Sequence, residues 1–417
     1  MGDKKTSGII VLALAGLCLS VGGPPARKAG AADIAAPAAA TVLSGQTSAP
    51  GAVQALIHPR PAGPIAERAA WARGEAKANR WEKGFWIGFG IRRFMGEHSS
   101  MGWYPWGGPE MHLTLEDIIS GRKTALEKKI DNDQAARGTA ASMPGLVRSF
   151  AAGRRDDEPE RPVMKDIGIL LRVAAGEEKF PADIRISNLD LPFDLEERPF
   201  IWLGMATDAE SLAYLIPLYG QATREDDKRS LLWAIGLHQD AAAVVPFVER
   251  ILASKESEEV RAEAAACLGE QNDPKALSLL LKTIKTDPSE EVRERAVGGL
   301  VEMELPAASE ALTTLALNGT DRDIRKEAVR GLADRADAAS IRTLEKISSG
   351  DKDPEIQEEA IHALADLPGR GGLAHLVNLV KTHADATVRR EAVEAIGDVG
   401  GPEAVKILAE WARGRRR

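Results

Sequence analysis

Cysteine is nearly absent from this sequence: Cys18 and Cys267 are the only two in 417 residues. If the N-terminal segment that contains Cys18 is removed during export, Cys267 is left alone and no disulfide can form within the chain. Burial of apolar side chains must then hold the protein together, even in an oxidising compartment. Aromatic residues are also scarce, at 5% of the chain, yet five of the eight tryptophans lie between residues 71 and 106. This uneven distribution divides the chain into unlike parts.

Recognisable catalytic and cofactor motifs are lacking as well. The sequence contains no Gly-x-Ser-x-Gly, no phosphate-binding loop and no dinucleotide fingerprint. Glu97-His98 and Glu110-x-His112 could supply metal ligands, but no His or Cys cluster at a known spacing accompanies them. We therefore expect no enzyme, no cofactor and no metal site. A formal net charge of −8 also makes the chain a poor candidate for binding nucleic acid, whose phosphates attract basic surfaces.

Residues 1–31 have the layout of a secretory signal peptide. Lys4 and Lys5 precede an uncharged apolar run over residues 8–21, and a small-x-small cleavage pattern follows at 29–31. We expect cleavage and export to the periplasm or the cell exterior, with no membrane span left in the mature chain; an uncleaved N-terminal membrane anchor is the alternative. Residues 32–65 are rich in Ala and Pro and almost uncharged, which predicts a disordered linker.

Residues 66–194 do not repeat and predict a small, Trp-rich α+β module. The stretch "IAERAAWARGEAKANRW" has helical spacing, whereas residues 85–91 place apolar side chains at alternate positions, as a strand does. Thr114 and Gly121 are the start and stop signals of one short helix. Residues 167–173 and 183–191 flank a turn region and predict a β-hairpin.

Residues 258–417 repeat with a period of 32 residues. In this register, four columns of apolar residues share one helical face, because their offsets are zero, four, five and eight residues. The columns are Val260, Val292, Ile324, Ile356, Val388; Ala264, Ala296, Ala328, Ala360, Ala392; Ala265, Val297, Val329, Ile361, Val393; and Leu268, Leu300, Leu332, Leu364, Ile396. A second face comes from Leu277, Ser309, Ile341, Leu373, Val405 and from Leu280, Leu312, Leu344, Leu376, Leu408. Each period therefore encodes two helices and two turns.

Helix-start signals agree with this layout. The expected N-caps, three residues before the first column, are Ser257, Ser289, Asp321, Asp353 and Asp385. Two looser copies precede the five, over residues 200–220 and 229–252. One helical hairpin cannot bury both of its faces, whereas stacked hairpins can. The sequence therefore predicts a mainly α protein in which residues 195–417 form an α-solenoid of six or seven hairpins.

The repeat unit resembles a known family. Residues 258–284 and 386–412 share a Val-Arg step, paired small residues, a Leu/Ile-Gly ending and a Pro that opens the second helix. These features closely resemble the short HEAT-like repeats of the phycobilin-lyase type, and the whole chain resembles exported bacterial HEAT-repeat proteins with a Trp-rich N-terminal segment. In the same family, deoxyhypusine hydroxylase uses His-Glu pairs to hold iron. The four histidines of the repeats, none followed by Glu, are His238, His362, His375 and His383; the resemblance therefore does not imply that activity.

An arginine column runs through the repeats. It consists of Arg261, Arg293, Arg325 and Arg389, with Gln357 as the exception. Such a stripe could bind anions, or it could pair with the acidic residues that recur two positions later, Glu263, Glu327, Glu359 and Glu391. We favour the second interpretation, an inter-repeat ladder.

The second helices carry basic residues away from their apolar columns: Lys282, Lys285, Arg342, Lys346, Lys381, Lys406 and Arg413. They could simply complement helix dipoles, or, if the second helices line a concave face, they could form a basic groove for an acidic partner segment. Trp103, Tyr104 and Trp106 belong to the densest aromatic patch. We favour a core role for that patch but keep these three as candidate partner contacts, because such rings also anchor interfaces.

The repeats and the absence of catalytic motifs together predict a non-enzymatic protein-interaction scaffold or adaptor of the bacterial cell envelope. The alternative is carbohydrate binding, ligand binding or enzymatic activity in the Trp-rich module, with the repeats as an adaptor. The partner and the oligomeric state are left open by the sequence.

Overall fold

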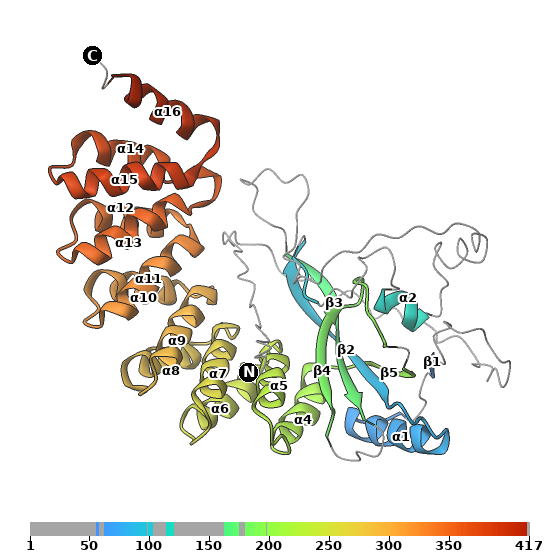
Figure 1. Ribbon diagram of the computed structural model, residues 1–417. Coiled ribbons are helices and arrows are strands. Elements are labelled where there is room, and N and C mark those ends of the chain that lie inside the picture. The colour runs from blue at the N-terminus through green and yellow to red at the C-terminus, as the bar shows by residue number, and fades with distance from the viewer. Residues whose placement is uncertain are drawn as a thin grey trace, which may run out of the picture.

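The computed structural model describes residues 56–57, 62–97, 99–102, 114–120, 162–174, 180–196 and 198–414. The predicted signal peptide (1–31), most of the predicted linker, and Trp103, Tyr104 and Trp106 lie outside these residues. The fold consists of one β-sheet followed by a long array of helices that rises away from it (Figure 1). Among the helices of the described residues, none has the length and apolar character that a membrane span needs.

Five strands form the sheet, in the order β1-β5-β2-β3-β4. Their bounds are β1 Leu56–Ile57, β2 Phe85–Gly96, β3 Pro162–Val173, β4 Asp183–Asn188 and β5 Phe200–Met205. The pairs β2–β3 and β3–β4 are antiparallel, whereas β5 pairs in parallel with both β1 and β2. The structure thus confirms the predicted strand at 85–91 and the predicted hairpin of 167–173 with 183–191.

Alternate residues of β2 face opposite sides of the sheet, as the strand period of two requires. Ile87 and Phe89 are fully buried on the side of α1 (Ile65–Ala78) and α4 (Asp208–Tyr219). Trp86 is buried on the other side, where Phe193 and Phe200 lie in the same apolar cluster, and its indole N–H donates to the carbonyl of Leu195 at 3.1 Å. Trp86 is therefore a core residue.

Two short strands correct the predicted domain boundaries. Residues 200–220 read as a degenerate repeat, but Phe200–Met205 is β5, an interior strand of the sheet between β1 and β2, and only α4 follows the helical pattern. The solenoid therefore begins after residue 205, not at 195. Leu56–Ile57, in the predicted linker, forms β1 against Phe200 and Ile201. The rest of the segment before residue 62 lies outside the described residues.

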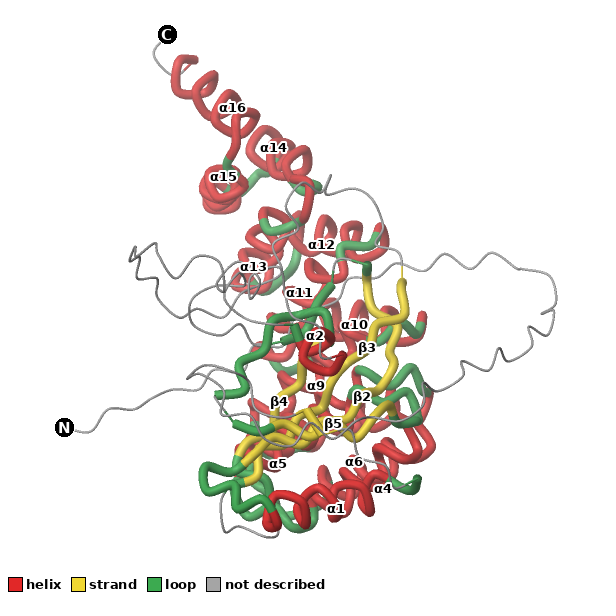
Figure 2. Tube along the Cα trace, turned by 90° about the vertical axis from the view of Figure 1, so that its right-hand side faces the viewer, coloured by secondary structure: helices red, strands yellow, loops and turns green. Residues whose placement is uncertain are grey.

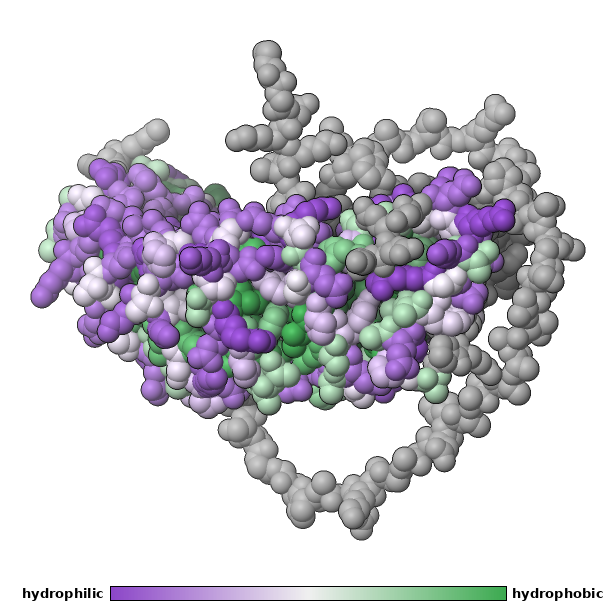
Figure 3. Space-filling view, turned by 90° about the horizontal axis from the view of Figure 1, so that it is seen from below, coloured by the Kyte–Doolittle hydropathy of each residue, from purple (hydrophilic) through white to green (hydrophobic). Residues whose placement is uncertain are grey.

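Twelve helices after α4 form six hairpins. Their bounds are α5 Glu225–Gly236, α6 Ala241–Leu252, α7 Glu258–Gly269, α8 Pro274–Thr286, α9 Glu290–Glu302, α10 Pro306–Asn318, α11 Arg322–Arg335, α12 Ala338–Gly350, α13 Pro354–Ala365, α14 Leu373–Thr382, α15 Ala386–Val399 and α16 Gly401–Gly414. The first helix of each hairpin has an odd number (α5, α7, α9, α11, α13 and α15) and the second an even number. Each first helix packs on the first helix of the next hairpin, so that α9, α11 and α13 lie on one side of α10 and α12 (Figure 2). Seen from below, the solenoid surface is mostly hydrophilic, with smaller hydrophobic areas near the middle (Figure 3).

The structure confirms the predicted N-caps and the predicted core columns of the repeats. Each of the five predicted N-cap side chains accepts a hydrogen bond from a backbone N–H of the helix that it precedes. The alanine column is fully buried in all five repeats, where adjacent first helices meet. Larger side chains there would overpack the contact, so the recurrent alanine sets the spacing of the array.

Polar contacts join the sheet to the start of the solenoid. The Arg93 guanidinium on β2 forms an ion pair with Glu270, at the end of α7, and donates to the carbonyl of Leu237 at 3.2 Å. The Gln271 amide donates to the carbonyl of His238 at 2.9 Å. Arg93, His238 and Gln271 are all buried. Since α5 also packs on β4, the sheet closes the first end of the helical array.

Candidate partner-binding surface

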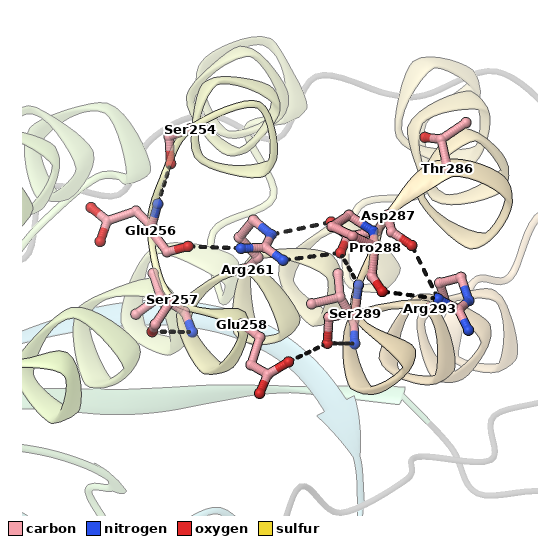
Figure 4. Close-up of polar contacts among 12 residues, drawn as sticks. Ser254, Glu256, Ser257, Glu258, Arg261, Thr286, Asp287, Pro288, Ser289 and Arg293 are labelled. Atoms are coloured by element: carbon pink, nitrogen blue, oxygen red, sulfur yellow. Dashed lines mark hydrogen bonds and ion pairs between the residues drawn. The ribbon is translucent and has the colours of Figure 1, made fainter.

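The arginine column forms clasps between a first helix and the turn that joins its repeat to the next one (Figure 4). Arg261 on α7 donates through Nε and Nη2 to the two carboxylate oxygens of Asp287, at 3.1 and 3.0 Å. It also donates to the carbonyl of Glu256 at 2.7 Å. Asp287 lies in the turn after α8, and its carboxylate accepts the backbone N–H of Ser289 as well. The ion pair raises the pKa of Arg261, chiefly through the hydrogen bond to Asp287.

The same clasp recurs along the array. Arg293 pairs with Asp321 at 3.4 Å, and Arg325 pairs with Asp351 at 2.6 Å. The predicted ladder to the glutamates two positions later is therefore wrong in its partners, since the clasp aspartates come from turns. Glu263 and Glu359 do form inter-repeat pairs, but with Arg295 and Arg330, at 3.9 and 2.8 Å. An anion-binding role for Arg261, Arg293 and Arg325 is disfavoured because their guanidinium groups are already engaged.

On α11 and α13, exposed charges of adjacent first helices are paired with one another. Arg322 on α11 pairs with Asp353 and Glu355 of the next repeat, at 2.8 and 2.9 Å, and Lys326 pairs with Glu355 at 2.7 Å. The hydrogen bond from Lys326, followed by the charge of Arg322, lowers the pKa of Glu355. These contacts engage Arg322, Lys326 and Glu355 within the array.

The basic residues of the second helices behave differently. All seven predicted side chains are exposed: Lys282, Lys285, Arg342, Lys346, Lys381, Lys406 and Arg413. None forms an ion pair with another residue of the described chain. The pKa of Glu249 is lowered chiefly by the hydrogen bond and charge of Lys275, and the charge of Lys282 adds only a minor contribution. The seven lie on α8, α12, α14 and α16, and α10 contributes no Lys or Arg. The structure thus leaves an interrupted row of unpaired cations on the second-helix layer.

Two buried groups inside α7 have structural surroundings. Cys267 is almost fully buried, its Sγ lies 3.0 Å from the carbonyl of Leu232, and burial raises the pKa of its thiol. Such a thiol is unreactive because the thiolate is the nucleophile. Glu263 is also buried, and burial raises the pKa of its carboxyl against the opposing effects of Arg295 and Arg229.

One group of side chains has the composition of a cation site. The possible ligand atoms of Glu358, His362 and Glu391 lie within 4.8 Å of one another, on α13 and α15. The sequence gives no sign of it, because Glu391 lies a whole repeat further along the chain. Arg390 already pairs with Glu391 at 2.7 Å, so a guanidinium balances part of this negative charge.

Sequence reasoning missed two features of this surface. The clasp aspartates were not predicted because they do not form a complete column. Asp287 and Asp351 share one register position, but Gly319 stands there in the repeat between them, and Asp321, two residues later, pairs with Arg293 instead. The exposure of apolar residues on α15 and α16 was not predicted, because the apolar columns have the same residue types in the last repeat as in the earlier ones. The aromatic candidates Trp103, Tyr104 and Trp106 lie outside the residues that the structure describes and stay predictions.

Comparisons with known proteins agree with the repeat architecture. The family profile described as HEAT repeats matches residues 212–301, 244–333, 309–383 and 341–416. Residues 212–416 are therefore an array of HEAT repeats, and the chain is a HEAT-repeat protein. The comparison with curated proteins gives no match.

Solved structures of similar repeats are distant from this chain. Human deoxyhypusine hydroxylase is 20% identical, with a TM-score of 0.22, over 49% of this chain and 78% of that chain. The CpcE–CpcF complex of phycocyanin lyase from Nostoc sp. PCC7120 is 22% identical, with a TM-score of 0.28, over 37% of this chain and 99% of that chain. At this level of similarity, neither the hydroxylase nor the lyase transfers an activity to this protein.

Proposed function

We propose that this HEAT-repeat protein is a non-enzymatic scaffold of the bacterial cell envelope, which captures an acidic segment of a partner protein on its second helices. The observation that carries the proposal is the contrast between the two helix layers. On α11, Arg322 and Lys326 are paired with carboxylates of the next repeat. Lys346, Lys381 and Lys406 of the second helices are instead exposed and form no ion pair with the described residues. Unpaired cations attract and orient an acidic partner without first breaking an existing ion pair.

The architecture supports the same function. An array of hairpins offers a long, continuous surface, which is the usual basis of partner binding in solenoids. The one thiol of the array, Cys267, is buried with a raised pKa and is a poor nucleophile. Residues 1–31 support the location, because their charge and apolar pattern is that of an export signal. The proposed acidic partner is then bound in the cell envelope, after the chain has been exported.

Charge reversal tests the proposal. Residues 32–417 would be immobilised and incubated with envelope extract, and captured proteins would be compared for the wild type and for a Lys346→Glu/Lys381→Glu variant. The matched control is Lys255→Glu/Lys352→Glu, which makes the same charge change at exposed turn residues. We expect the first variant to lose a captured partner that the control retains, and added salt to weaken capture by the wild type.

Equal capture by both variants would rule out the second-helix surface. A further variant that lacks residues 258–417 separates the alternative function from the scaffold. If it still binds a glycan, or the same partner, the activity belongs to the Trp-rich module.

A further inference from the structure

The last described repeat leaves its packing face uncovered. In the four preceding repeats, the first helix of the next repeat packs against this face, and the central leucines are fully buried: Leu280, Leu312, Leu344 and Leu376 are each 0% exposed. Their counterpart Leu408 on α16 is only partly buried. Val405, one turn earlier, is 62% exposed, whereas its counterparts Leu277 and Leu373 are 9% and 5% exposed, and Ser309 and Ile341 are partly buried.

The α15 side of this face is uncovered as well. Val393 is partly exposed, although the same column is at most 1% exposed in the four earlier repeats. A Cβ built on Gly397 would meet nothing within 4 Å, whereas a Cβ on its counterpart Gly269 would lie 2.7 Å from the Gly299 backbone. Val393, Gly397, Val405 and Leu408 thus form a seat, which we call the end seat, shaped like the surface that receives a first helix elsewhere in the array (α16 is the uppermost helix in Figure 1).

The charges beside the end seat are those that hold a first helix in the earlier repeats. Arg389 is the clasp arginine of this repeat, but among the described residues it donates only to the backbone carbonyls of His383 and Ala384. Its counterparts Arg261 and Arg325 bind an aspartate in the turn before the next first helix. Arg390 occupies the register of Lys326, which binds Glu355 in the first turn of the next first helix. Arg390 instead pairs with the adjacent Glu391 of its own helix, at 2.7 Å, and an acidic first turn in the seat would compete for this guanidinium.

From this pattern we propose that the end seat binds an amphipathic α-helix of a partner protein, preceded by an aspartate and acidic in its first turn. The aspartate pairs with Arg389, and the acidic first turn faces Arg390. Small and β-branched residues of the helix cover Val393, Gly397 and Val405. The inference rests on the proposed scaffold function and names a second, separate contact for the same partner or for another one.

A second copy of the chain fits the end seat less well. Two end seats placed face to face would bring Arg389 and Arg390 of both copies together, and like charges repel at such an interface. Head-to-tail stacking also fails, because the opposite end of the array is covered by the sheet through α5–β4 packing and the Arg93–Glu270 pair.

The chain itself supplies the probe for a test. A fluorescent peptide of residues 286–303 contains α9, which covers α7 and α8 in the array. Its Asp287 is the clasp partner of Arg261, and its Gly299 packs on Gly269; these partners are the counterparts of Arg389 and Gly397. We expect saturable binding of this peptide to the full chain, measured by fluorescence anisotropy.

Variants on both sides of the contact sharpen the test. Val405→Asp should weaken binding at least about tenfold, because it places a charge in an apolar contact. The control Leu281→Asp, at an exposed residue of α8 outside the end seat, should leave binding unchanged. Arg390→Glu should also weaken binding, and a Glu291→Arg peptide should restore it, which a merely structural role of Arg390 would not explain.

Three results would overturn the proposal: no saturable binding, binding that Val405→Asp leaves intact, or sedimentation data that show self-association through the end seat. The peptide titration needs no native partner, and the charge reversals on α12 and α14 do not touch the end seat. Either idea can therefore fail while the other stands.

Discussion

Gly269 and Gly299 bring two first helices into backbone contact: a Cβ built on Gly269 would lie 2.7 Å from the Gly299 Cα and 2.8 Å from its carbonyl oxygen. Both partner atoms belong to the backbone, so the neighbour cannot rotate away. Alanine at this position must instead separate α7 from α9. The distance between α7 and α9 at this point therefore depends on Gly269 having no Cβ methyl group.

Gly269→Ala should accordingly destabilise the protein by about 1–3 kcal/mol, the usual cost of overpacking. Gly298→Ala, in the neighbouring helix α9, is the matched control, since its Cβ would meet nothing within 4 Å. That change should stabilise by about 0.5–1 kcal/mol, because alanine favours a helix interior. Urea unfolding followed by circular dichroism measures both. Equal shifts in the same direction would contradict the close contact.

The clasp predicts a second effect on stability. Asp287→Ala leaves Arg261 without its bidentate partner, and the two side chains are only 8% and 14% exposed. Removing one member of such a partly buried pair should cost about 2–4 kcal/mol. Glu394→Ala serves as the control, because its pair with Arg390 at 4.0 Å is exposed at both ends and should change stability by less than about 1 kcal/mol. Thermal melts at neutral pH decide between these outcomes.

Glu263 predicts a pH-dependent effect. Burial raises the pKa of its carboxyl in the folded protein, so the folded state holds a proton more tightly than the unfolded chain. The resulting stability is present at low pH and is lost as the pH rises through the folded pKa. Glu263→Gln, which cannot ionise, should therefore gain stability relative to the wild type between pH 4 and pH 7. A constant difference across this range would show that Arg295 and Arg229 fully offset burial.

His238 predicts the opposite dependence. Its ring is fully buried, its Nδ1 contacts the carbonyl of Ile235 at 3.2 Å, and its Nε2 has no hydrogen-bond partner among the described residues. Burial lowers the pKa of His238, against the charge of nearby Asp208, so the unfolded chain takes up a proton before the folded protein does. Wild-type stability should fall as the pH drops below about 6.5. His238→Gln should remove this slope in urea titrations at pH 5.5 and 7.5, while a slope of unchanged size would assign it to other groups.

The parts of the fold that the sequence predicts are those with a fixed period. The column from Val260 to Val388 and the N-caps from Ser257 to Asp385 recur every 32 residues, so local propensity and array packing agree at each one. The strand β2 can be predicted equally well, because apolar residues occupy alternate positions over its first half: Phe85, Ile87, Phe89 and Ile91.

The elements that the sequence does not predict depend on distant pairing. The short apolar run of β5, Phe200–Met205, fits a helix or a strand, and only its place between β1 and β2 decides. β1 has two residues, too few for any period. On the surface, the exposed cations could be predicted residue by residue, whereas the clasp aspartates and the end seat depend on which faces meet and which do not.

The ion pair between Arg93 and Glu270 attaches the first hairpins of the array to the sheet. Each hairpin touches mainly its neighbours, so small rotations between them add up along the chain. Displacements relative to the sheet should therefore increase along the solenoid and be largest, among the described helices, at α16. A protein bound at α16 would take up a wide range of positions relative to the sheet. A protein bound near α8 would stay at a nearly constant distance from the sheet.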